Sequence, residues 1–251
     1  MSDVKPGKFA TEPFEFADGI SQPIIRGGRP KRSTDNDIHM VEPGEFILGY
    51  PDNHGNIPNT PTVESMRDPS NILPVLNLSS NISEVTKFDN DEGNAIRDLR
   101  KNGSFLVVRQ IAQHQKLFDT YVKQQAKNIA KHPGLPKSLD TALKREDWVG
   151  AKLVGRWKDG TSLIRHPHQP GNIWSDGTQV NQTVIEPDND FLFGDEDPID
   201  HGCPFGAHIR RSNPRDSLNP NSDEQLAITN RHRILRWGRT YVAGVNEKAA
   251  K

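Results

Sequence analysis

The sequence predicts an α+β fold with long irregular segments, on the basis of three observations. A dense β-branched and aromatic run, "GSFLVVRQIAQ" (103–113), indicates a strand, and a helical pattern follows it directly. A second helical pattern begins shortly downstream. Hydrophobic residues make up only 33% of the 251 residues, whereas 19 prolines and 20 glycines favour loops. We therefore expect a thin hydrophobic core that a partner or ligand helps to order.

Two helices are predicted after the strand. In "HQKLFDTYVKQQAKNIAKH" (114–132) apolar residues recur near helical spacing. "PKSLDTALKREDWVGAKLVGRW" (136–157) is the second helical stretch, with Ser138 or Asp140 as its N-cap.

The remaining stretches are shorter or richer in loop signals. "HIRRSNP" (208–214) alternates like a strand, and "ITNRHRILRWGRTYV" (228–242) indicates a strand pair or hairpin. "EPGEFILGYP" (42–51) is either a short strand or a buried loop. We divide the chain into a loop-rich segment, 1–102, and a more ordered domain, 103–251.

Composition excludes several classes of protein. A net charge of -1 provides no positive field for nucleic acid. No apolar run approaches the roughly 18 residues of a membrane span, and the first residues lack the apolar centre of a signal peptide. The only cysteine cannot form an internal disulfide. We expect a cytoplasmic protein that binds neither nucleic acid nor membrane.

A histidine stands out in "GCPFGAHIRRSNPRD" (202–216), held in a constrained loop and followed by three arginines. His208 is a candidate metal ligand, although spacing alone favours a core histidine that has its own hydrogen-bond partners. A zinc site of His201, Cys203 and His208 falls short of the usual four ligands.

The arginines allow two interpretations. In a strand, Arg210 would share a face with His208, and Arg211 would point the opposite way. Such a cluster suits the carboxylates or phosphates of a cofactor, or else it belongs to a salt-bridged surface.

An Asp-Gly pair in "FADGISQP" (16–23) indicates a tight turn. Asp18 would act as an acid–base group there if its carboxylate were partly buried, but the turn needs no function. "GRWKDG" (155–160) is a second such turn, to which we assign no chemistry.

Six stretches in one order carry a resemblance that covers nearly the whole chain. Together they resemble the dye-decolourising peroxidases, which are haem enzymes. The stretches are "FADGISQPIIRG", "EPGEFILGYPDNHGNIP", "GSFLVVRQIAQ", "AKLVGRWKDGTSL", "CPFGAHIRRSNPRD" and "RHRILRWGRTY".

The resemblance implies a ferredoxin-like antiparallel sheet with helices, a haem b cofactor and a role for several residues. It makes His208 the proximal ligand of the haem iron, Asp18 the distal acid–base residue and Arg236 the arginine over the distal haem face. Arg210 and Arg233 would compensate the haem propionates. The implied substrates are hydrogen peroxide and organic reductants such as dyes or phenols. Trp237 and Tyr241 are candidate electron relays, although packing roles are favoured for both.

The sequence departs from the family pattern in two ways. Glu15 replaces the first glycine of the family's "GxxDG" motif, at a stability cost if the backbone needs a positive φ there. The resemblance also covers only a middle portion of the family, without its N-terminal half and closing C-terminal elements. Unpaired strand edges would then favour a homo-oligomer or a second chain that supplies the missing strands. The alternative is a truncated, non-catalytic relative or an interaction protein that retains no haem.

Overall fold

The computed structural model describes residues 11–29, 37–75, 96–99, 101–171 and 189–238. Helices and small sheets are both present in an α+β arrangement, as predicted. The helices are α1 (Gln115–Ile129), α2 (Ala142–Val154), α4 (Phe193–Glu196), α5 (His208–Ser212) and α6 (Asp223–Arg231), with single 3-10 turns at Asp37–His39, Pro43–Glu45 and Ser65–Arg67.

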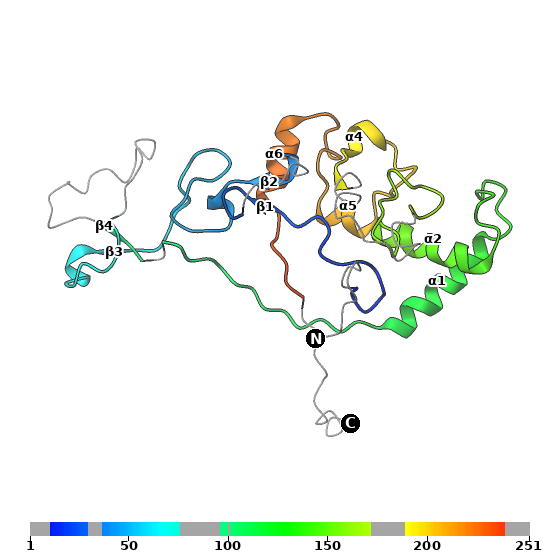
Figure 1. The fold of residues 1–251 in the computed structure, drawn as a ribbon, viewed down its shortest axis with the longest axis horizontal. Coiled ribbons are helices and arrows are strands. Elements are labelled where there is room, and N and C mark those ends of the chain that lie inside the picture. Colours follow the sequence, from blue (N-terminus) through cyan, green and yellow to red (C-terminus); the bar gives the residue numbers. More distant parts are fainter. Residues whose placement is uncertain (1–10, 30–36, 76–95, 100, 172–188, 239–251) are drawn as a thin grey trace, which may run out of the picture.

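Two sheets of two strands each occur in the described residues. Strands β1 (Ile24–Ile25) and β2 (Met40–Val41) pair in parallel, with Ile24 opposite Met40. Strands β3 (Thr62–Glu64) and β4 (Ile96–Asp98) pair antiparallel, with Val63 opposite Arg97. The β3–β4 pair lies at one end of the molecule and α1 at the other (Figure 1).

The main core gathers around α2, α4 and α5, which lie together in Figure 1. Its buried residues are Ala151, Trp157, Leu163, Ile164, Phe191, Phe193, Cys203 and Ala207. A second small cluster, Val122, Ala126 and Val149, joins α1 to α2. The loops between the helices supply most of the core, which explains how a chain with so little apolar content still encloses one.

The two long helices were predicted correctly, but the N-cap of α2 was not. Thr141 caps α2, because its side chain accepts a hydrogen bond from the backbone N–H of Lys144. Gly155 ends the helix at φ 97°, where a Cβ would lie 2.3 Å from Ile209 Cγ1. Only glycine allows both that backbone conformation and that approach of α5.

The strand predicted at 103–113 is wrong. The segment runs as extended chain between β4 and α1 and pairs with no described strand (Figure 1). Its apolar side chains stand in solvent, with Phe105 68% and Leu106 87% exposed. A β-prone run becomes a strand only beside a partner, and the described part of the chain supplies none.

The strand predicted at "HIRRSNP" is also wrong, because residues 208–212 form α5. The backbone N–H of Arg211 bonds to the carbonyl of Ala207. Residues two positions apart lie on nearly opposite sides of a helix, so His208 and Arg210 do not share a face.

The expected strand pair at 228–242 is likewise not found in the described residues. The stretch 228–231 belongs to α6, His232 caps that helix, and residues 233–238 form no strand; residues 239–242 lie outside the described part of the chain. "EPGEFILGYP" is the buried loop rather than the strand, with a 3-10 turn at Pro43–Glu45 and with Leu48 8% exposed.

Hydrogen bonds join the predicted loop-rich segment, 1–102, to the predicted domain, 103–251. The amide of Asn230 donates to the carbonyl of Ile38, and the backbone N–H of Ala17 donates to the carbonyl of Lys158. The division of the chain at this boundary stays a prediction. No described helix is long and apolar enough to cross a membrane.

Candidate active site

Asp18 and Arg236 lie side by side although they come from opposite ends of the chain. Asp18 Oδ1 is 3.7 Å from Arg236 Nη2, and both side chains are about half exposed. The same oxygen accepts a hydrogen bond of 2.7 Å from the backbone N–H of Gly19, which fixes the carboxylate in the turn. The structure thus places a proton acceptor and a fixed positive charge together at the surface of the molecule.

The turn that carries Asp18 packs on the second Asp-Gly turn, residues 155–160. Phe16 is buried, and the backbone N–H of Ala17 bonds to the carbonyl of Lys158 at 3.0 Å. At Gly160, φ is 95° and a Cβ would lie 2.4 Å from Ile20 Cδ1. A glycine at 160 therefore lets the two turns pack closely, which positions Asp18.

Ser21 anchors the other end of the turn. Its φ of 70° is in the left-handed region, and its hydroxyl donates to Asn189 Oδ1 at 2.6 Å. Arg156 donates from Nη2 to the same hydroxyl at 3.1 Å and to Asn189 Oδ1 at 2.8 Å. Sequence reasoning missed Arg156 and Asn189, because an arginine before an Asp-Gly turn and an isolated asparagine are both common features.

Three arginines concentrate positive charge behind this turn. Arg233 donates from Nη2 to the carbonyl of Ser21 at 2.6 Å, and burial lowers its pKa to about 10. Arg215 is 3% exposed, and its guanidinium lies 3.7 Å from the centre of the Phe191 ring. Burial lowers the pKa of Arg215 most, and the charges of Arg156 and Arg233 lower it further.

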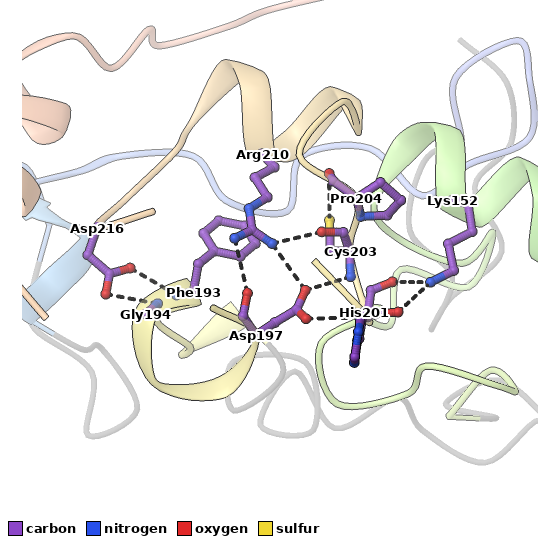
Figure 2. A network of polar contacts seen from close by, with 10 residues as sticks. Lys152, Phe193, Gly194, Asp197, His201, Cys203, Pro204, Arg210 and Asp216 are labelled. Atoms are coloured by element: carbon purple, nitrogen blue, oxygen red, sulfur yellow. Dashed lines mark hydrogen bonds and ion pairs between the residues drawn. The ribbon is translucent and has the colours of Figure 1, made fainter. Parts of the chain in front are cut away.

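Arg210, the other predicted cofactor contact, points into the protein. Figure 2 shows its guanidinium between Asp197 and Cys203. It lies 3.1 Å from Asp197 Oδ2 and donates to the carbonyl of Cys203 at 2.8 Å. Arg210 is 2% exposed and its ring neighbours are Phe193 and Phe205. A role for Arg210 at cofactor carboxylates therefore has no support in this arrangement.

His208 is the first residue of α5 and its side chain is exposed. Within the described residues, its ring makes no hydrogen bond or ion pair, so it is not the satisfied core histidine that spacing favoured. The neighbouring Ile209 packs at Gly155, which anchors α5 on α2. The imidazole is accessible to a ligand that approaches from outside this part of the chain.

The zinc site considered for Cys203, His201 and His208 is not supported. Among the described residues, no group of three histidine, cysteine or acidic side chains could hold a metal ion. Burial raises the pKa of the Cys203 thiol to about 11, with Arg210 opposing it, so the thiol stays protonated at neutral pH. A zinc ligand must lose this proton, so the raised pKa weakens metal binding by the thiol.

The residues present fit a haem in the chemistry of their donors. His208 offers an accessible imidazole, and Asp18 and Arg236 form a separate carboxylate–guanidinium pair. Trp237 is 94% exposed beside Arg236, and Tyr241 lies outside the described residues.

Comparisons with known proteins agree with these features. No protein-family model matches the chain. A dye-decolorizing peroxidase of Mycena epipterygia is 30% identical over 95% of this chain and 36% of its own length. Dye-decolorizing peroxidase msp1 of Mycetinis scorodonius is 27% identical over 87% of this chain and 32% of its own.

The fold comparison gives the same result. A solved structure of an ancestral D-type dye decolorizing peroxidase matches with a TM-score of 0.57 at 25% identity, over 96% of this chain and 42% of that one. The chain spans about a third of the length of the curated relatives it matches. In sequence and in its loop-rich α+β fold, the chain is similar to the dye-decolorizing peroxidases over this part of their length.

Proposed function

We propose that this chain acts as a haem peroxidase that reduces hydrogen peroxide at the expense of an organic reductant such as a dye or a phenol. The observation that carries the proposal is the 3.7 Å approach of Asp18 to Arg236. Two segments from distant parts of the sequence meet, so that a carboxylate lies beside a guanidinium. The relationship to dye-decolorizing peroxidases supports the same reading.

The chain's own residues divide the chemistry among them. Haem b, when bound, supplies the iron that binds peroxide and stores its two oxidising equivalents. Asp18 takes a proton from the oxygen of the incoming peroxide and returns it to the oxygen that leaves. The guanidinium of Arg236 offsets the negative charge that grows as the O–O bond breaks.

One histidine and one arginine would hold the cofactor. His208 would ligate the haem iron, because its imidazole is accessible. Arg233 lies behind the Asp18 turn and suits a propionate. Arg210 would not contact the cofactor, because its charge is matched by Asp197.

Exposed apolar residues in one segment support a proposal that the working protein contains further polypeptide. Phe105, Leu106, Val107 and Val108 are all more than two thirds exposed and alternate between two faces of an extended segment. A run that is apolar on both faces is typical of a strand buried on both sides. We propose that another copy or a second chain supplies the missing strands. With one cysteine, a reducing cytoplasm remains part of the proposal.

A hemin titration of the full chain tests the function. We expect a Soret band sharper than that of free hemin, which His208→Ala removes and which peroxide shifts. His201→Ala is the matched control, because it removes another exposed histidine a few residues away.

The opposite result separates the alternatives. A spectrum that matches free hemin in all three proteins would sink the haem proposal for this chain. The chain would then be a non-catalytic relative or an interaction protein, and sedimentation would show whether it associates without haem.

A further inference from the structure

We propose that Gln22 is a positioning residue that holds Arg236 against Asp18. This inference rests on the proposed function, in which Asp18 and Arg236 act together on peroxide. It concerns an amide side chain that carries no charge and takes no part in proton transfer itself.

Arg236 is not held in place by packing. It lies in the segment 233–238, outside any described helix or strand. Its neighbours Leu235 and Trp237 are 54% and 94% exposed. Some other interaction must therefore fix the backbone from which the guanidinium extends.

The ion pair with Asp18 is too weak to do this alone. Its two atoms are 3.7 Å apart, and the side chains of Asp18 and Arg236 are 43% and 55% exposed. Exposed pairs of this kind are screened by water and salt, and many of them add nothing measurable to stability. The pair is a consequence of how the two segments meet.

The side chain of Gln22 makes the specific contact between the segments. Its Nε2 donates to the carbonyl of Arg236 at 2.8 Å, and its Oε1 accepts from the backbone N–H of Arg236 at 3.2 Å. Two opposite residues of an antiparallel ladder exchange the same pair of hydrogen bonds. The amide of Gln22 thus takes the place of a strand residue and fixes both backbone groups of Arg236.

A second contact next to Gln22 strengthens the junction. Arg233 donates from Nη2 to the carbonyl of Ser21 at 2.6 Å. Ser21 is itself fixed to Asn189 through its hydroxyl. The turn that carries Asp18 therefore also holds the segment that carries Arg236. The same contacts set the distance between the two charged groups.

The first test measures the junction without any cofactor. In the full chain, Gln22→Met keeps a side chain of similar length and removes both hydrogen bonds. We expect the backbone N–H of Arg236 to exchange with solvent about fivefold faster or more by NMR. Gln124→Met is the matched control, because Gln124 on α1 also donates a hydrogen bond, to Asn128. It should leave Arg236 unchanged, and amides of α2 should exchange at the parent rate in both variants.

The second test asks whether Gln22 acts through Arg236. With hemin bound, Gln22→Met should slow peroxide consumption by about 10- to 100-fold, as expected when a reacting group is misplaced. In an Arg236→Met background the same change should have less than about a twofold effect. A residue with a merely structural role would slow both backgrounds alike.

The outcomes distinguish this inference from the proposed function. Unchanged exchange at Arg236, or equal effects of Gln22→Met in both backgrounds, would overturn the positioning role. Faster exchange in a chain that fails to bind hemin would instead uphold the junction and reject the haem proposal.

Discussion

Arg210 and Asp197 form an ion pair inside the protein, with 3.1 Å between Nη1 and Oδ2 and with 2% and 4% of their side chains exposed. The other oxygen of Asp197 accepts a hydrogen bond of 2.9 Å from the backbone N–H of Gly202. The pair thus fastens α5 to the end of α4 (Figure 2), and the Gly202 hydrogen bond ties the loop before α5 to the same carboxylate.

Loss of Arg210 should therefore destabilise the chain. Arg210→Met leaves the carboxylate of Asp197 buried without its cation, so the free energy of unfolding should fall by about 3–5 kcal/mol. Arg211→Met is the control, because Arg211 is exposed on the same helix and should change stability by about 0.5 kcal/mol or less. Denaturant titration without hemin measures both. If Arg210→Met kept its stability but lost hemin binding, Arg210 would instead be a cofactor contact.

The acid–base role of Asp18 is tested by Asp18→Asn, which keeps the shape and removes the proton acceptor. We expect peroxide consumption by the hemin-loaded chain to fall by about 10²–10⁴-fold, with the Soret band retained. Asp119→Asn is the control, because Asp119 is exposed on α1, and this variant should keep the parent rate. Equal rates for Asp18→Asn and the parent chain would assign the proton transfer elsewhere.

Glu15 bears the backbone strain that its position in the motif predicted. Its φ is 72°, a left-handed value that favours glycine, and its carboxylate lies 2.8 Å from Lys158 Nζ. Glu15→Ala loses the ion pair and keeps the strain, whereas Glu15→Gly loses the pair and relieves the strain. We expect the glycine variant to exceed the alanine variant by about 1 kcal/mol in free energy of unfolding. Equal stabilities would mean that the turn relaxes around alanine.

The N-cap of α2 offers a direct comparison of sequence and structure. Thr141→Ala should cost about 1 kcal/mol of unfolding free energy, since its side chain satisfies the backbone N–H of Lys144. Ser138→Ala, at one of the positions predicted from the sequence, removes only an exposed contact to the carbonyl of His168. Thermal unfolding should therefore separate the two variants by several degrees. If Ser138→Ala lost more stability than Thr141→Ala, the N-cap of α2 would be Ser138, one of the two residues predicted from the sequence.

Helices were predictable where their cause is local. The apolar spacing of α1 and α2 depends on residues a few positions apart, so it can be recognised from the sequence. The run 103–113 has strong β-propensity, but a strand requires a partner, and no described segment pairs with it. The stretch "HIRR" alternates over too few residues to distinguish a strand from one helical turn. The buried contact of Arg210 with Asp197, 13 positions earlier, lies outside any local pattern.

The candidate site shows the same contrast between local patterns and contacts with remote segments. Asp18 and His208 were candidates from their local sequence, but their haem roles and the choice of Arg236 came from a family resemblance. The structure brings Asp18 and Arg236 together. Gln22 and Arg156 were missed because each acts through a contact with a remote segment. No periodicity or turn signal reports such a contact.

The buried thiol of Cys203 should make stability depend on alkaline pH. Burial raises its pKa from 9.0 to about 11, so the folded chain keeps a proton that the unfolded chain releases between these values. The stabilisation is complete below pH 9 and is lost as the pH rises toward 11, by up to about 3 kcal/mol. In Cys203→Ala the free energy of unfolding should lack this fall, so the difference between the two proteins should shrink across the window. Burial also lowers the pKa of nearby Lys152, but that group is present in both proteins and largely cancels in the difference. Parallel stability curves from pH 8 to 11, or rapid alkylation of the native thiol at pH 8, would show that Cys203 titrates as an ordinary exposed cysteine.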